Sequence, residues 1–193
     1  MKWSDLTLAH VLEAANRIEP LARRTPLAES TPLGDETGAK GVYLKLESLQ
    51  NTGAFKVRGA SNRILSLSDQ ERRRGVITFS TGNHGKAVAY VAGQTGIPAV
   101  VCVSAHVAPY RVEKIRRLGA EVVVKGESQD EAELEYNRIM EERKMVPVVP
   151  FDDPYVVCGQ ATIGLEMMSV QPELDTMLVP LSGGGLLAGV ALA

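Results

Sequence analysis

The sequence is poor in the residues that form metal sites and disulfides. Only two of its 193 residues are cysteine and three are histidine. His10, His84 and His106 match no metal-ligand spacing such as H-E-x-x-H, so we predict no metal site. Cys102 and Cys158 lie far apart in apolar runs, which favours two buried thiols in a reducing compartment over a disulfide framework.

The chain also lacks a net basic charge. Its formal net charge is -2 and its pI is about 6.0. The basic run at 72–74 follows Asp69 and Glu71 at an expected helix end, where cations interact favourably with the helix dipole. We therefore expect a solvated helix end and no extended nucleic-acid surface.

Long apolar runs are absent as well. Residues 1–8 contain no apolar core of a signal peptide, and no later run reaches the roughly 18 apolar residues that a membrane span requires. With 45% hydrophobic residues, the chain can still bury a full core. We expect a soluble, cytoplasmic protein without a membrane partner.

The sequence does contain a regular alternation of strand-like and helix-like patterns. From Gly75 onward, short β-rich runs are separated by helical stretches that stop at Gly96 and Gly119. This order is typical of parallel βαβ units, so we predict an α/β fold with parallel-rich sheets flanked by helices. The predicted strands are 76–79, 99–103, 121–124 and 146–149, and the predicted helices are 84–95, 109–118 and 128–143.

Further elements flank this unit. Ser4 or Asp5 can cap a first helix that runs to Ile18, and the alternation at 42–47 predicts a strand. After the regular unit we predict a helix at 157–170, a buried strand at 176–180 and a short last helix from Leu186.

We predict two domains from this arrangement. Residues 75–150 form a small inserted α/β domain, and residues 1–74 combine with residues 151–193 into a larger domain. The strand at 176–180 needs neighbours that this sequence does not obviously supply. We therefore expect the chain to be the front part of a longer polypeptide, with its larger domain incomplete.

The first candidate for chemistry is Lys56. It follows a flexible Thr-Gly-Ala turn and Phe55, and it opens a helical pattern with apolar residues at 57, 60 and 64. A partly desolvated amine near Arg58 and a helix N-terminus would favour its neutral, nucleophilic form, which can make a Schiff base with an aldehyde. The alternative is an ordinary solvated lysine at a helix start.

Two loops could bind anions. Residues 80–85, Ser-Thr-Gly-Asn-His-Gly, follow a predicted strand and open a helix, which suits a carboxylate. The alternative there is an ordinary capped turn. Ser182 and three glycines at 183–185 follow the strand predicted at 176–180 and have the pattern of a phosphate cradle. Gly183, Gly185 and Gly189 also give a dinucleotide-like G-x-G-x-x-x-G pattern, but this chain ends before the position, about 20 residues on, where a ribose-binding acid would appear. No G-K-[ST] follows, and the first glycine of a nucleophile elbow is missing.

An amine, a phosphate cradle and a carboxylate loop together are what pyridoxal phosphate chemistry on an amino acid requires. The chain resembles the fold-type II pyridoxal-phosphate enzymes, in the branch of threonine/serine dehydratases and serine racemases. The matching segments are Ala54-Phe55-Lys56-Val57-Arg58-Gly59-Ala60, Ser80-Thr81-Gly82-Asn83-His84, residues 151–155, residues 159–166 and Ser182-Gly183-Gly184-Gly185-Leu186. They appear in the family's order and span almost the whole chain.

The resemblance implies a role for each of these residues. Lys56 would hold pyridoxal 5'-phosphate and remove the substrate α-proton, with Thr81 as a second catalytic residue. The implied cofactor-binding residues are Phe55, Lys56, Asn83, Ser182, Gly183, Gly184, Gly185 and Leu186. The implied substrate-binding residues are Ser80, Thr81, Asn83 and His84.

The implied activity is that of an ammonia-lyase that removes water from a small β-hydroxy amino acid such as threonine or serine, giving a 2-oxo acid and ammonia. The implied assembly is a homodimer or a higher homo-oligomer. A hydroxyectoine-derived amino acid as substrate, and serine racemase activity, stay open as alternatives. Thr81 stands where the racemases of this family have a serine. A second alternative is a truncated, inactive homologue that acts as a binding or assembly module.

Overall fold

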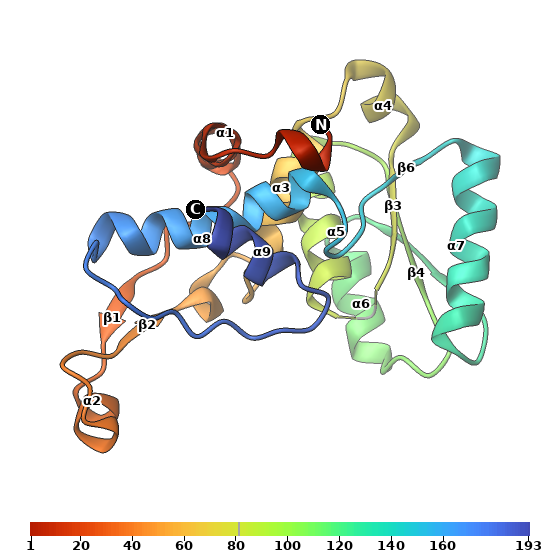
Figure 1. Ribbon diagram of the computed structural model, residues 1–193. Helices are drawn as coiled ribbons and strands as arrows, with labels where there is room; N and C mark the ends of the chain where they lie inside the picture. Colours follow the sequence, from red (N-terminus) through yellow and green to blue (C-terminus); the bar gives the residue numbers. More distant parts are fainter. Residues whose placement is uncertain (81) are drawn as a thin grey trace.

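The protein is described by a computed structural model that covers residues 1–80 and 82–193. A four-stranded parallel sheet with its helices forms one half of the molecule, and a group of helices with a two-stranded sheet forms the other (Figure 1). The predicted α/β class is therefore confirmed. Among the described residues, no helix has the length and apolar character that crossing a membrane requires.

The parallel sheet has the strand order β5-β4-β3-β6. Val76 of β3 lies opposite Ala99 of β4 on one side and Val146 of β6 on the other. The first three strands lie where the alternation predicts them, whereas the last is two residues shorter than the predicted 146–149. The elements of this half are α4 (Asp69–Arg74), β3 (Val76–Phe79), α5 (Asn83–Thr95), β4 (Ala99–Val103), α6 (Pro109–Arg117), β5 (Glu121–Val124), α7 (Gln129–Arg143) and β6 (Val146–Pro147).

Helices cover both faces of this sheet, which explains why its central strand is apolar throughout. Every residue of β4 is buried, and side chains alternate between two cores because successive residues of a strand point to opposite faces. Val101 packs toward α5, whereas Val100 and Cys102 pack with Tyr136 and other side chains of α7.

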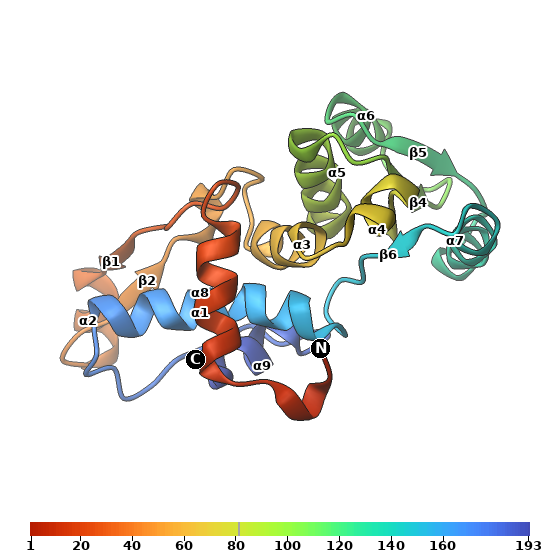
Figure 2. The same ribbon diagram turned by 90° about the horizontal axis from the view of Figure 1, so that it is seen from above.

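The other half is built around a long, largely buried helix, α8. Helix α3 packs on one side of α8 and α9 on another, and α1 crosses it (Figure 2). A small two-stranded antiparallel sheet, β1-β2, extends from this group together with α2, which connects its two strands. The elements of this half are η1 (Trp3–Asp5), α1 (Leu8–Ile18), β1 (Leu27–Glu29), α2 (Thr31–Thr37), β2 (Tyr43–Lys45), η2 (Glu47–Leu49), α3 (Lys56–Leu65), α8 (Pro154–Val170) and α9 (Gly185–Leu192).

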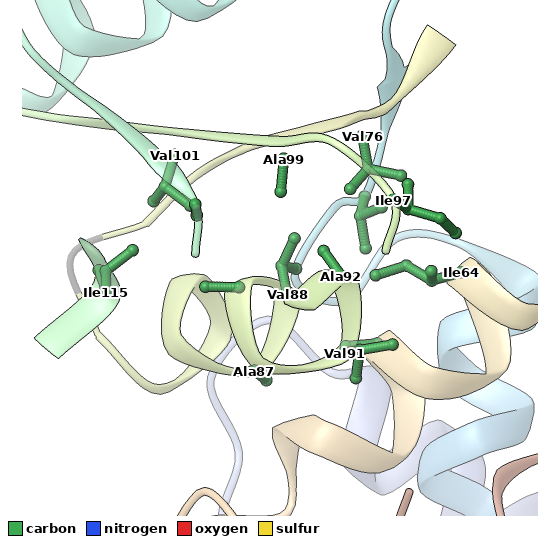
Figure 3. Packing of buried hydrophobic residues seen from close by; sticks show 14 of the residues in the cluster. Ile64, Val76, Ala87, Val88, Val91, Ala92, Ile97, Ala99, Val101 and Ile115 are labelled. Carbon is green, nitrogen blue, oxygen red and sulfur yellow. The ribbon is translucent and has the colours of Figure 1, made fainter. Parts of the chain in front are cut away.

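Helix α3 joins the two halves. Its Val57 and Ile64 are fully buried and belong to the same core cluster as Val76 and Val88. Figure 3 shows Ile64 beside the side chains of α5 at the edge of the sheet. The predicted division into 1–74 plus 151–193 and 75–150 stays a prediction, since the core crosses residue 75.

Helices α3 and α8 approach closely because Gly59 and Gly159 face each other. A Cβ atom on Gly159 would lie 2.6 Å from the carbonyl oxygen of Arg58 and from the Cα atom of Gly59. Real Cβ atoms do not approach so closely, so α3 and α8 can pack at this distance only without side chains at both positions. This contact fixes the direction of the helix that begins at Lys56.

The structure corrects several predicted boundaries. Residues 176–180 form no strand, because among the described residues nothing pairs with their backbone, and Leu178 is 95% exposed. The first helix begins at Leu8, since Ser4 and Asp5 lie in a separate 3-10 turn. The strand predicted at 42–47 is reduced to Tyr43–Lys45.

Candidate active site

Lys56 is the first residue of α3, as predicted. Gly53 supplies the positive φ of +74° that the preceding turn needs. The Nζ atom donates a hydrogen bond of 2.7 Å to the carbonyl oxygen of Pro150 and lies 5.2 Å from the centre of the Phe55 ring. Burial lowers the pKa of this amine from its ordinary value of 10.5. Lys56 is therefore a partly desolvated amine next to the chain that leads into α8.

Arg58 does not contribute to that pKa shift in the way the sequence suggests. Its guanidinium turns away from Lys56 into a cluster with Glu47 and Glu166, which neutralise its charge. Burial alone would lower the pKa of Arg58, but the hydrogen bonds with these two carboxylates raise it. The expected role of Arg58 beside the lysine is corrected accordingly, and desolvation remains as the cause at Lys56.

The loop at 80–85 follows the carboxyl end of β3 and leads into α5. Asn83 is exposed and is the first residue of α5, and Ser80 is partly exposed. The first helical hydrogen bond of α5 runs from Lys86 to Gly82. The amides of residues 83–85 therefore have no partner within the helix and face the side from which an anion would approach. Thr81 lies outside the described residues.

The side chain of His84 is buried and hydrogen-bonded within the protein. The imidazole is 2% exposed, and its Nε2 atom donates to the carbonyl oxygen of Val148 at 2.8 Å. Burial, together with the nearby charge of Lys56, lowers the pKa of His84 to about 4, so the ring is neutral at pH 7. With this side chain buried, His84 can offer its backbone amide in the first turn of α5, and its role in substrate binding stays a prediction.

The glycine loop at 183–185 packs against Phe151. A Cβ atom on Gly183 would lie 2.3 Å from Cδ1 of Phe151, and one on Gly185 would lie 2.9 Å from the carbonyl oxygen of Phe151. Gly184 has a φ of +83°, which a glycine adopts without strain. Side chains are therefore excluded from this loop by contact at two positions and by backbone conformation at the third.

Helix α9 begins directly after this loop. Its first helical hydrogen bond runs from Ala188 to Gly184, so the amides of Gly185 and Leu186 precede it without a partner in the helix. Ser182 and Gly183 are exposed beside them. The loop thus precedes a helix N-terminus with free backbone amides in its first turn, and its use as a phosphate cradle stays a prediction.

One short segment of chain, residues 148–151, brings these three groups together. Val148 accepts the bond from His84, Pro150 accepts the bond from Lys56, and Phe151 packs on the glycine loop. No sequence motif marks Val148 or Pro150 as functional residues. Their position in the sequence could have indicated a role, because they lie at the end of a predicted parallel strand and ligands bind at the carboxyl ends of such strands.

A second contact supports the lysine turn. Lys86 of α5 donates a hydrogen bond of 2.7 Å from its Nζ atom to the carbonyl oxygen of Thr52. Lys86 also lines a cavity of about 300 Å³ together with Asn83 and Tyr110. This lysine, which no sequence motif marks, therefore joins the start of α5 to the turn before Lys56.

A larger cavity of about 420 Å³ opens at the carboxyl ends of β3 and β4. Its lining includes Ser80, Ser104, His106 and Tyr110. Ser80 and Asn83, two of the predicted substrate-binding residues, thus line neighbouring cavities that share Tyr110. No group of three or more metal-ligating side chains occurs in the part of the chain that the structure describes.

Comparison with known proteins agrees with this arrangement. Residues 18–193 match the protein family described as "Pyridoxal-phosphate dependent enzyme". The chain is 44% identical over 188 residues to the L-threonine ammonia-lyase of Thermotoga maritima, covering 97% of this chain and 47% of that protein. It is 41% identical over 159 residues to the serine racemase of Oryza sativa subsp. indica, covering 82% of this chain and 47% of that protein.

Solved structures show the same fold. Maize serine racemase superposes with a TM-score of 0.92 at 39% sequence identity, covering 96% of this chain and 56% of that chain. The chain spans about half the length of the curated relatives it matches. On the family match over most of its residues, this chain belongs to the pyridoxal-phosphate dependent enzymes.

Proposed function

We propose that this chain supplies the cofactor-holding and proton-transferring residues of an ammonia-lyase that removes water from a small β-hydroxy amino acid, such as threonine or serine. The observation that carries the proposal is the junction at Pro150 and Phe151. Pro150 holds the amine of Lys56 at 2.7 Å, and the next residue packs on Gly183 and Gly185. The amine of Lys56 and the glycine loop therefore contact two consecutive residues, Pro150 and Phe151.

The residues present fit pyridoxal 5'-phosphate. The cofactor needs an amine for its aldehyde and donors for its phosphate, and these are Lys56 and the amides at 183–186. The absence of side chains lets the loop lie directly against Phe151, where a Cβ on Gly183 would meet the ring at 2.3 Å, and leaves its backbone amides as the donors. Asn83, exposed at the start of α5, would hold the ring hydroxyl, and Phe55 would pack beside the ring.

When bound, the cofactor supplies an electron sink for the bond broken at the substrate α-carbon. The chain's own residues perform the remaining tasks. Because burial lowers the pKa of Lys56, more of its amine is unprotonated near neutral pH than in a free lysine, and the unprotonated Nζ atom can take the α-proton as a general base. The backbone amides of residues 83–85 and the hydroxyl of Ser80 would hold the substrate carboxylate.

The choice of substrate class follows the relatives and one feature of the loop. The comparison proteins are named L-threonine ammonia-lyase and serine racemase, and both names refer to small hydroxy amino acids. We place elimination first because Thr81 stands where the racemases of this family have a serine. Racemisation is an alternative that the assay below separates from elimination, and the hydroxyectoine-derived substrate stays an alternative. Homo-oligomer formation stays a prediction.

The test is a substrate screen with two readouts. The 193-residue chain and Lys56→Ala are incubated with pyridoxal phosphate and with L-serine, L-threonine or D-serine, and ammonia and 2-oxo acid are measured. We expect equal amounts of both products from an L-hydroxy amino acid with the natural chain and none with the variant. Inversion without ammonia would favour the racemase. Cofactor binding without any turnover would favour the binding or assembly module.

A further inference from the structure

The first turn of α3 contains a buried ion cluster that the catalytic proposal does not use. The side chain of Arg58 is 0% exposed, and those of Glu47 and Glu166 are each 15% exposed. The Nζ atom of Lys45 lies 2.5 Å from Glu166. Two cations and two carboxylates leave the cluster neutral. Losing one partner would leave a buried charge uncompensated, which is strongly destabilising.

Every nitrogen of the Arg58 guanidinium has an acceptor. Nε donates to Glu47 at 2.9 Å, and Nη1 donates to Thr162 at 3.0 Å and to Glu166 at 2.6 Å. Nη2 donates to the carbonyl oxygen of Arg23 at 3.1 Å, to Glu47 at 2.8 Å and to Glu166 at 2.9 Å. These acceptors come from the loop before β1, from η2 and from α8, so one side chain ties three segments to α3.

The geometry of an α-helix places Arg58 and its hydrogen-bond partners on the side of α3 opposite Lys56. Residues two positions apart in an α-helix point about 200° apart around its axis. Arg58 therefore anchors the side of the first turn of α3 that lies opposite the side chain of Lys56. The long, flexible stem of a lysine gives its amine no fixed position by itself, so the position of the Nζ atom depends on how firmly its backbone is held.

We propose that Arg58 is a positioning residue for Lys56: its planar set of hydrogen bonds holds the first turn of α3 so that the amine meets the cofactor beside the glycine loop. This inference rests on the proposed function. Glu47, Glu166 and Thr162 are the groups through which Arg58 acts. They bond the guanidinium of Arg58, and the proposal has them affect the reaction only through the backbone of Lys56.

The test compares Arg58→Lys with Arg63→Lys in the full 193-residue chain. Arg58→Lys keeps the charge but loses the planar fork. Arg63 is the matched control, because it lies on the same helix and its Nε atom is 3.2 Å from Asp153 at the start of α8. We measure how fast the visible band of lysine-bound cofactor appears after mixing with pyridoxal phosphate, and how much of the Lys56 peptide carries the cofactor after borohydride reduction.

We expect Arg58→Lys to form the band about tenfold or more slowly, since small displacements of a reacting group cost large factors in rate. Arg63→Lys should stay within about twofold of the natural chain, on the same reasoning. Thermal unfolding of both variants shows whether they lose similar stability. Equal slowing in the two variants, or an unchanged rate in Arg58→Lys, overturns the positioning role.

A second variant covers the case in which Arg58→Lys does not fold. Thr162→Val removes one acceptor of Nη1 and leaves both ion pairs in place. We expect slower band formation here too, and a folded Thr162→Val with the natural rate overturns the proposal. If the natural chain itself forms no band, the proposed function fails. If the natural chain forms the band and only the positioning role fails, the natural chain and the Arg58 and Thr162 variants form it at the same rate.

Discussion

Phe151 lies so close to Gly183 that a Cβ atom on the glycine would come within 2.3 Å of the Cδ1 atom of the ring. Phe151 directly follows Pro150, whose carbonyl oxygen accepts the hydrogen bond from Lys56. Lys56 and Gly183 are far apart in the sequence. Pro150 and Phe151 bring them together, because one contacts Lys56 and the other contacts Gly183.

Gly183→Ala should damage the glycine loop without removing any functional side chain. The added methyl group must displace Phe151 or the loop, and overpacking of this kind costs about 1–3 kcal/mol. We expect the dissociation constant of pyridoxal phosphate to rise by roughly tenfold or more, which corresponds to about 1.4 kcal/mol. Titration of the cofactor absorbance measures the effect.

Gly34→Ala is the control for that substitution. Gly34 lies in α2, and a Cβ atom there would have only an ordinary contact of 3.7 Å with the carbonyl oxygen of Ala39. Alanine in a helix is favoured over glycine by about 1 kcal/mol, so this variant should be no less stable and should bind the cofactor normally. Equal affinity of the Gly183 and Gly34 variants would show that the loop at 183 is not a cofactor contact.

Lys56 should react as an amine at lower pH than a free lysine. A protonated amine does not attack electrophiles, so labelling increases as pH rises through the pKa of the group. Because burial lowers the pKa of Lys56 from 10.5, its labelling midpoint should fall below that value. Competitive amine labelling of the cofactor-free chain, read peptide by peptide, gives the midpoint. A midpoint at or above 10.5 would contradict the desolvated amine.

His84 should make the stability of the protein sensitive to mild acid. Its pKa is about 4 in the folded chain and 6.5 ordinarily, so the unfolded chain binds more protons between these values. The stabilisation is complete above pH 6.5 and is lost as pH falls toward 4, by on the order of 3 kcal/mol. Urea unfolding at pH 7 and pH 4 should therefore show a larger loss in the natural chain than in His84→Gln. The same loss in both chains would refute the buried neutral imidazole.

The regular half of the fold could be predicted well from sequence. The runs at 76–79, 99–103 and 121–124 are apolar, β-rich and separated by helical patterns, and each forms a strand of the parallel sheet. The run at 176–180 has the same composition but forms no strand. A strand exists only through hydrogen bonds to a neighbour, and the composition of a segment does not say whether a neighbour is present.

The site could be predicted only in part, for a similar reason. Lys56 and the glycines at 183–185 could be selected because reactive amines and glycine-rich turns have recognisable local patterns. Pro150 and Phe151 have no such pattern, since their role comes from the backbone carbonyl of one and the packing of the other. The direction of Arg58 was likewise set by Glu166, more than a hundred residues away in the sequence.

The most direct test of the central claim is to locate the covalent attachment of the cofactor. The chain is mixed with pyridoxal phosphate, reduced with borohydride, digested and examined by mass spectrometry. We expect the reduced adduct on the peptide that contains Lys56, in close to one copy per chain at saturating cofactor, and a clearly lower yield in Gly183→Ala at a cofactor concentration that half-saturates the natural chain. Attachment mainly at Lys45, at Lys86 or across surface lysines would contradict the assignment of Lys56 and the glycine loop to one site.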